Sequence, residues 1–266
     1  NQYLDSTSNI TVEDMMKLQN NNKGLLPAET LPTLLEYAAL DKLNAEQVKF
    51  IEPLRSWDYD YAPDQAAPVM FHMWWDHFFE LLWDEFYYTE TRQVKPEYYY
   101  TSIFIKEHTD DPYVDYQGTA KVESLQDLVL ASLDSAMNDY SEWINDDNRD
   151  MPWGWYKDTM VKHLADQGGA LAPFSRPHIM VGGQSKAINS TKGQHGPSQR
   201  IVIQLTDPPQ AWWIIPGGQS GNPGSPRYDN MIDMWRDGDY YQLQRMDSPE
   251  EDRGQVVFTQ QLNPKN

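Results

Sequence analysis

The segment 217–230 holds the serine whose neighbours best suit a nucleophile. It reads Gly-Gly-Gln-Ser-Gly-Asn-Pro-Gly-Ser-Pro-Arg-Tyr-Asp-Asn. Glycines around Ser220 would let the backbone turn sharply and approach another group closely. A nucleophile elbow, however, has the order Gly-x-Ser-x-Gly between a strand and a helix. Here the order is Gly-Gln-Ser-Gly and prolines follow, so the sequence does not favour a Ser-His-Asp triad built on Ser220.

Histidines and carboxylates elsewhere match no metal-binding pattern. His72 and His77 are five residues apart on an expected helix, whereas zinc ligands on one helix face are three or four apart. Residues 143–150 are rich in Asp and Asn but lack the glycine and the final glutamate of an EF-hand loop, which favours a plain turn. We therefore predict no metal site in this chain.

Three carboxylates recur every four residues, those of Asp76, Glu80 and Asp84. At helical spacing they lie along one face, where two of them could in principle work as an acid and a base. A stripe of this kind is more often a solvated helix face, and that is the interpretation we adopt.

Composition excludes several classes of partner. The net charge of −19 over 266 residues disfavours binding to nucleic acid and to an anionic membrane surface. There is no cysteine, which rules out disulfides and thiolate metal sites and fits a periplasmic or secreted protein. The chain opens with Asn1 and shows no signal peptide, so we expect it to begin inside a longer precursor or to have been trimmed.

Helix signals recur in the first half of the chain, where capping residues or a proline precede apolar residues at helical spacing. They predict helices that begin at Thr11, near Pro32, at Asn44 and at Ser124, and a helix with the stripe Phe71, Trp75, Phe78 and Leu82. Pro53 is expected to end the helix that begins at Asn44. The loops 56–66 and 108–118 are candidate surface or cleft-lining segments.

The composition shifts near residue 166, after which Gly and Pro dominate. Short β-rich runs lie at 200–205, 211–215 and 255–259, and Asp207-Pro208-Pro209 predicts a hairpin connection between the first two. We therefore predict an α+β chain in two parts. Residues 1–165 form a mostly helical subdomain, and residues 166–266 form a strand-and-loop region that contains the 217–230 segment.

The same segment carries a family resemblance. The chain is similar to the penicillin acylase (penicillin amidase) family, whose C-terminal block resembles HGxSxRxVxxL…PGGQSGxPxSPHYDDxxxxWxxGxY. The matching positions are His195-Gly196, Ser198, Arg200, the 217–230 segment, Trp235, Gly238 and Tyr240. Weaker markers in the family's order are Thr11–Met15, Gln19, Trp57-Asp58, Trp153-Gly154, His163-Leu164, Gly182-Gly183 and Ile188-Asn189. Three positions depart from the pattern, with Lys157 and Arg227 where His is usual and Asn230 where Asp is usual.

The resemblance implies chemistry that this chain does not itself carry. Members of the family are N-terminal nucleophile hydrolases, in which self-cleavage of a precursor frees a Ser whose own α-amine acts as its base. An Asn and backbone donors stabilise the oxyanion, and an amide is cleaved into a carboxylic acid and an amine. In the family's order these residues, and the ligands of a calcium ion, precede the helix that begins at Thr11. The implied fold is the C-terminal portion of an αββα sandwich.

The site expected within the chain is therefore not catalytic. The candidates for lining a cleft or holding a loop in shape are His195, Arg200, Gln219, Ser220, Asn222, Tyr228 and Asp229. We expect Arg200 to anchor the 217–230 loop, and Gln219 and Ser220 to sit at its apex. The implied partners are the upstream remainder of the precursor (a small chain and the N-terminal part of the large chain) and a small-molecule amide. No cofactor is expected in this chain, although the intact enzyme can hold calcium through upstream residues.

The aromatic residues leave one alternative open, a secreted carbohydrate- or peptide-binding module. Ten Trp and sixteen Tyr include the runs Trp74-Trp75, Tyr98-Tyr99-Tyr100 and Trp212-Trp213. Exposed rings stack on sugars, but large aromatic side chains are usually buried, which favours filling of a core. Three or more coplanar rings along one groove would support the alternative.

Overall fold

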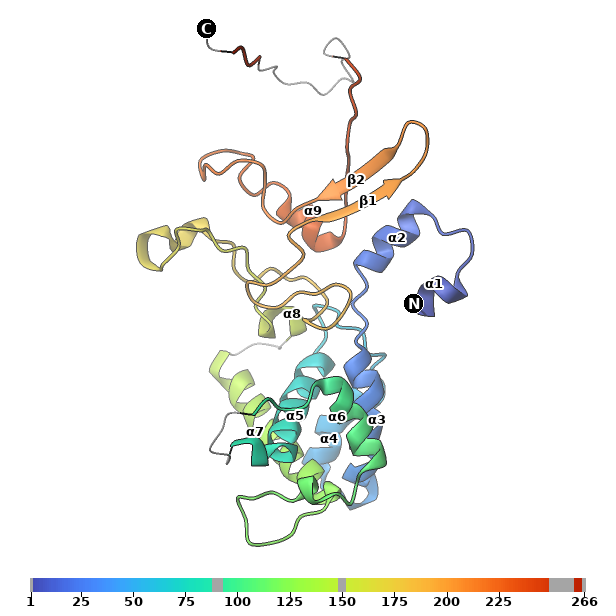
Figure 1. The fold of residues 1–266 in the computed structure, drawn as a ribbon. Helices are drawn as coiled ribbons and strands as arrows, with labels where there is room; N and C mark the ends of the chain where they lie inside the picture. The colour runs from blue at the N-terminus through green and yellow to red at the C-terminus, as the bar shows by residue number, and fades with distance from the viewer. Residues whose placement is uncertain (1, 88–92, 148–151, 249–260, 265–266) are drawn as a thin grey trace.

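The computed structural model describes residues 2–87, 93–147, 152–248 and 261–264 (Figure 1). The α-helices are α1 Gln2–Ser6, α2 Val12–Gln19, α3 Leu25–Ala38, α4 Ala45–Arg55, α5 Ala67–Leu82, α6 Tyr98–Glu107, α7 Leu125–Asp147, α8 Trp153–Tyr156 and α9 Ile232–Asp237. The strands are β1 Arg200–Gln204, β2 Gln210–Ile214 and β3 Tyr241–Gln242. Short 3-10 helices lie at η1 Leu40–Lys42, η2 Asp84–Tyr87, η3 Pro112–Val114 and η4 Gly169–Phe174.

Helices α3 to α7 pack into the body in the lower half of Figure 1. The predicted aromatic stripe of α5 is confirmed, because Phe71, Trp75, Phe78 and Leu82 are all fully buried. Helix α5 packs along α7, and α3 contacts both α6 and α7. Burying each such side chain stabilises the fold by roughly 1.5–3 kcal/mol, so this one face fixes the helix in the core.

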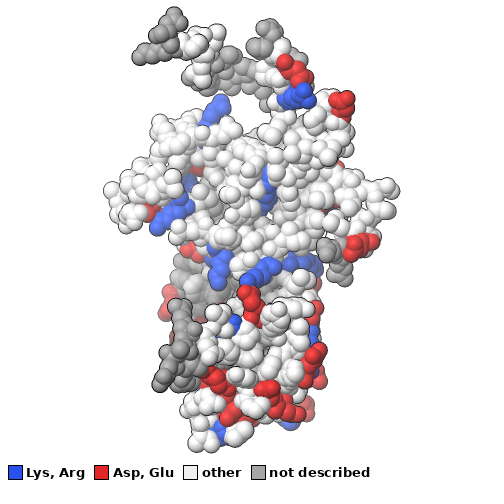
Figure 2. Space-filling model, viewed as in Figure 1, with Lys and Arg blue, Asp and Glu red and all other residues white. Residues whose placement is uncertain are grey.

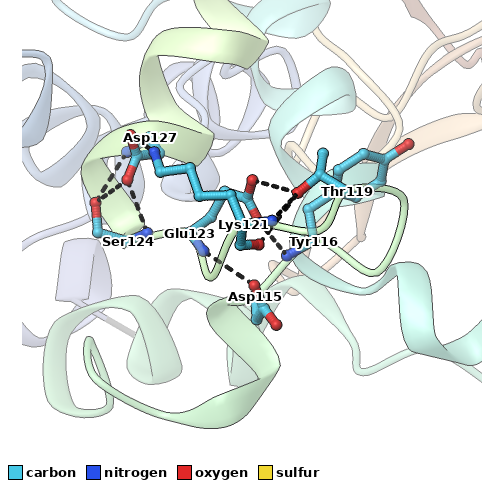
Figure 3. Close-up of polar contacts among 7 residues, drawn as sticks. All are labelled: Asp115, Tyr116, Thr119, Lys121, Glu123, Ser124 and Asp127. Atoms are coloured by element: carbon cyan, nitrogen blue, oxygen red, sulfur yellow. Dashed lines mark hydrogen bonds and ion pairs between the residues drawn. The ribbon is translucent and has the colours of Figure 1, made fainter.

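The long helix α7 begins at the predicted position because of the residues that precede it (Figure 3). The carboxylate of Asp127 accepts hydrogen bonds from the backbone and hydroxyl of Ser124 at 2.9 and 2.6 Å. Lys121 reaches the same carboxylate at 2.6 Å. These contacts, with that of Lys121 the largest, hold the pKa of Asp127 at about 2. A negative charge in the first turn also complements the helix dipole.

The strands and α9 lie at the opposite end of the molecule, with coil and α8 between them and the helical body (Figure 1). Strands β1 and β2 pair antiparallel with Arg200 opposite Ile214 and Gln204 opposite Gln210, which confirms the predicted hairpin. A second buried cluster supports this end, formed by Ile179, Val181, Ile214, Met231 and Trp235. The third predicted run, 255–259, lies outside the described residues.

The start of the chain packs against this end. Gln19 of α2 donates to the carbonyl of Ile201 in β1 at 2.9 Å, and the hydroxyl of Tyr240 donates to Gln19 at 2.8 Å. Two of the sequence markers are therefore in contact although 221 residues separate them. The boundary between residues 165 and 166 stays a prediction.

The predictions for the roles of two prolines were wrong. Helix α3 begins at Leu25, so Pro32 lies inside it rather than in its first turn. Pro53 does not end α4, which continues to Arg55. A proline removes only one backbone donor, and burial of Leu31 and Leu34 around Pro32, and of Leu54 after Pro53, outweighs that loss.

The prediction that Asp76, Glu80 and Asp84 form a solvated helix face is wrong for Asp84. This residue is 3% exposed and lies beyond the end of α5. Its carboxylate accepts the backbone N–H of Gln117 at 2.9 Å, and burial raises its pKa. Asp84 thus holds the loop before α7 instead of facing solvent with Asp76 and Glu80.

The negative net charge comes from residues 1–150, which include the helices α1 to α7. Residues 1–150 contain 29 acidic and 10 basic residues, whereas residues 151–266 contain 11 of each. Figure 2 shows Asp and Glu gathered over the helical body on this face. Among the described residues, none of the helices combines the length and the apolar character needed to cross a bilayer.

Candidate functional site

The 217–230 loop closes on itself through its backbone. Gly217 has φ 111°, a conformation that favours glycine. A Cβ at Gly218 would overlap the carbonyl oxygen of Arg227, so only glycine fits that approach. The backbone N–H of Ser220 donates to the same carbonyl at 3.1 Å. The glycines therefore serve a tight return of the chain.

The hydroxyl of Ser220 has a structural contact. It accepts the backbone N–H of Asn222 at 3.2 Å, and the Asn222 amide oxygen accepts the N–H of Gly224 at 3.0 Å. Within the described residues, neither a histidine nor a carboxylate is bonded to Ser220. Its surroundings are those of a turn residue and not of an activated nucleophile.

Gln219 faces a hollow of about 580 Å³ between the loop and the sheet. Its side chain is exposed and has no hydrogen-bond partner among the described residues. Arg227 and Asn230 line the same hollow, together with the apolar residues Trp213, Met231, Tyr241 and Leu243. Arg227 and Asn230, two of the three residues that depart from the family pattern, thus lie on the same surface as Gln219 at the apex of the loop.

Tyr228 and Asp229 tie the loop to the segment around η4. The hydroxyl of Tyr228 donates to the carbonyl of Phe174 at 2.7 Å. The carboxylate of Asp229 binds Arg176 at 2.7 Å from Nε and 2.6 Å from Nη2. The guanidinium of Arg176 also lies 5.3 Å from the ring centre of Tyr228. Phe174 and Arg176, which lie outside the loop, therefore hold it in position.

Arg200 is an anchor, but its predicted partner was wrong. Its guanidinium is 3% exposed and donates to the carbonyl of Trp235 at 2.6 Å and to Oδ1 of Asn189 at 2.8 Å. It has no hydrogen bond to the 217–230 loop or to a carboxylate among the described residues. Burial lowers its pKa to about 10. Arg200 therefore joins β1 to α9 and to the 189 segment.

His195 lies apart from the loop. It is exposed, and its backbone exchanges two hydrogen bonds of 2.8 Å with Lys192. It lines a pocket of about 230 Å³ with Thr159, Ser198 and Trp235. Trp235 connects the segment that follows His195 to Arg200. Its indole N–H donates to the carbonyl of Pro197 at 3.0 Å, and its own carbonyl accepts from Arg200.

A buried lysine is the residue that sequence reasoning undervalued. Lys157 is 5% exposed, and its ammonium donates to the carbonyls of Gly182 and Gly183 at 2.7 and 3.1 Å and to the hydroxyl of Thr191 at 2.5 Å. Burial lowers its pKa to about 6, whereas the three acceptors favour the charged form. The sequence did mark this position, because Lys157 stands where the family usually has His. The Gly182-Gly183 pair that it binds is also one of the family's markers.

His77 and His72 contact an acidic and an aromatic side chain, respectively. His77 contacts Asp139 at 2.7 Å, and His72 stacks on Trp153 with ring centres 4.9 Å apart. In the described part of the chain, no three His, Cys, Asp or Glu side chains are grouped as a metal ion would require. The acidic run at 143–150 lies partly outside the described residues.

The aromatic runs give the alternative function little support. Trp74 and Trp75 are fully buried in the helical core. Tyr99 and Tyr100 are exposed, but their rings cross at 69° and so present no flat platform. The predicted filling of a core is confirmed for the tryptophan pair.

Comparison with known proteins relates most of the chain to one family. The sequence model of the family described as penicillin amidase matches residues 1–251. The acyl-homoserine lactone acylase QuiP of Pseudomonas syringae pathovar tomato is 29% identical over 145 residues, or 50% of this chain and 18% of that protein. The enzyme of the same name from Pseudomonas fluorescens is 27% identical over 142 residues, or 50% of this chain and 17% of that protein.

A solved structure gives the fold. Penicillin G acylase from Alcaligenes faecalis matches 100% of this chain and 52% of its own chain, with a TM-score of 0.52 and 14% sequence identity. The predicted α+β class and the portion of an N-terminal nucleophile hydrolase fold are thereby confirmed. The chain spans about half the length of that solved chain, and its match covers less than a fifth of the acyl-homoserine lactone acylases.

Proposed function

The chain belongs to the penicillin amidase family, and from that premise we propose that the whole protein is an amidohydrolase whose serine nucleophile lies outside residues 1–266. The observation that carries the proposal is the family match over residues 1–251. The geometry agrees with it, because Ser220 has a turn role and no base beside it in the described residues.

The proposed reaction is acyl transfer to an N-terminal serine. The hydroxyl oxygen attacks the amide carbonyl, the serine's own α-amine takes the hydroxyl proton, and that proton then goes to the leaving amine. Water hydrolyses the ester that remains, which releases a carboxylic acid and restores the serine. Donors aimed at the carbonyl oxygen stabilise the charge that develops there.

Residues 1–266 would supply the scaffold and part of a cleft wall. The hollow lined by Gln219, Arg227 and Asn230 is the surface we assign to that wall. The substrate class we propose is a linear acyl amide, because the similar proteins are acylases of homoserine lactones and of penicillin G. A calcium ion held upstream and a periplasmic or secreted location remain predictions. We propose in addition a role in antibiotic metabolism, because one similar protein is a penicillin G acylase.

Activity of the full-length protein tests the proposal. We expect it to hydrolyse a chromogenic phenylacetyl amide or an N-acyl homoserine lactone, and we expect residues 1–266 alone to be inactive. The Ser220→Ala variant of the full-length protein should retain turnover. Loss of turnover in that variant with an unchanged melting temperature would place the nucleophile at Ser220 and overturn the proposal.

A further inference from the structure

A second cavity lies away from the 217–230 loop, where α5, α8 and the segment 184–192 meet. Its volume is about 330 Å³, at the lower end of the range of small-molecule pockets. Its lining combines His72 and Asp76 of α5 with Gln184, Ser185 and Lys192. Trp153, Tyr156 and Lys157 complete the lining, and the ammonium of Lys157 is already bonded to Gly182, Gly183 and Thr191. A space of this size, lined by so many polar groups, suits a small and polar occupant.

Two buried polar atoms at this cavity have no partner. Gln184 is 3% exposed, and its Nε2 has no hydrogen-bond partner, whereas its Oε1 accepts the backbone N–H of Lys186 at 2.8 Å. Nε2 of His72 is likewise buried without a partner. Burial lowers the pKa of His72 to about 3, so its imidazole is neutral at physiological pH. Leaving such groups unpaired costs about 1–3 kcal/mol each, which a bound polar ligand would offset.

Two opposite charges border the same space. Asp76 and Lys192 both line the cavity, and both are exposed to solvent. Desolvation raises the pKa of Asp76, and the charge of Lys192 opposes this with a smaller lowering effect. Among the described residues, neither side chain has an ion-pair partner within 4.0 Å. The charged groups of Asp76 and Lys192 are therefore close enough to interact but do not form an ion pair with each other.

We propose that this cavity binds a small zwitterion of the size of an α-amino acid. The ligand's ammonium would contact Asp76, and its carboxylate would contact Lys192 and the Nε2 of Gln184. A purely anionic ligand would face the carboxylate of Asp76, and an apolar ligand would leave Gln184 and His72 unpaired. Only a molecule with both charges pairs Asp76, Lys192 and the Nε2 of Gln184 at once.

Calorimetric titration of the full-length protein at pH 7.5 tests the proposal with three matched probes. L-alanine carries both charged groups, propanoate lacks the ammonium, and ethylamine lacks the carboxylate. We expect L-alanine to bind and each of the other two to bind at least about tenfold more weakly. Binding needs no turnover, so failure here leaves the proposed amidohydrolase activity standing.

Single substitutions then assign each charge. Asp76→Asn should weaken L-alanine and ethylamine, and Lys192→Met should weaken L-alanine and propanoate, each by about tenfold. Both side chains are exposed, so both variants should keep the melting temperature of the wild type. The matched controls are Asp64→Asn and Lys186→Met, which do not line this cavity and should not change binding. Absence of L-alanine binding, or equal binding by the wild type and both cavity variants, would overturn the proposal.

Discussion

The guanidinium of Arg200 lies over the indole of Trp235, 4.9 Å from its ring centre, and donates to the backbone carbonyl of the same residue at 2.6 Å. One side chain thus contacts both the ring and the backbone of a residue 35 positions away. Because Trp235 is in the second buried cluster, this contact joins β1 to the core beneath α9.

Replacing Arg200 by Met should lower the free energy of unfolding by about 3 kcal/mol, because the carbonyl of Trp235 and the amide oxygen of Asn189 would be left buried without a donor. Arg236→Met is the matched control on α9. Its guanidinium makes surface ion pairs with Asp233 and Asp237, which contribute about 0–1 kcal/mol. Urea unfolding of the two variants measures the difference, and equal losses would contradict the anchoring role of Arg200.

The half-buried His72, whose Nε2 is fully buried, should make the protein less stable in acid. Burial lowers the pKa of His72 in the folded state from its ordinary value of 6.5 to about 3, because burial disfavours the charged ring. Between these two pH values the unfolded chain binds a proton that the folded chain does not, so stability falls as the pH falls. The slope is at most about 1.4 kcal/mol per pH unit.

His72→Phe keeps a ring against Trp153 and removes this titration. We expect the variant to lose less stability than the wild type between pH 6.5 and pH 4.5, by about 2 kcal/mol. The control is His108→Phe, at an exposed ring that stacks on Phe104, and this variant retains His72. Chemical unfolding at several pH values makes the comparison, and parallel curves for all three proteins would refute the assignment.

The close return of the 217–230 loop predicts different effects at two glycines. Gly218→Ala places a Cβ against the carbonyl of Arg227, which is backbone and cannot rotate away, so we expect a loss of about 1–3 kcal/mol. At Gly221 no atom lies within 4 Å of an added Cβ, so Gly221→Ala should change stability by about 0.5 kcal/mol or less. Thermal unfolding of both variants is the test, and a tolerated alanine at 218 would show that the loop is not held as described.

What the sequence predicted well was local. The capping boxes at Thr11 and Asn44 are both present, because each depends on two residues three positions apart. The hydrogen-bond partners of Arg200 could not be predicted from local sequence patterns. Asn189 and Trp235 reach Arg200 only through the packing of the coil and α9. Pro53 misled for a related reason, because the burial of Leu54 is a tertiary effect that local propensity does not contain.

Gln219 is the residue for which a structural role and a functional role can be separated. The loop is closed by Ser220, Asn222 and Arg227 through contacts that do not involve the Gln219 side chain. Because that side chain is exposed and has no partner among the described residues, Gln219→Ala should leave the melting temperature of the proposed full-length amidohydrolase unchanged. If the hollow is part of the cleft wall, kcat/KM should fall about tenfold, equivalent to loss of one hydrogen bond of about 1.4 kcal/mol.

Ser220→Ala is the contrasting variant, since it removes a loop contact and should lower the melting temperature while turnover of the folded enzyme persists. A Gln219→Ala enzyme with a lower melting temperature and normal kcat/KM would leave the loop only its structural role.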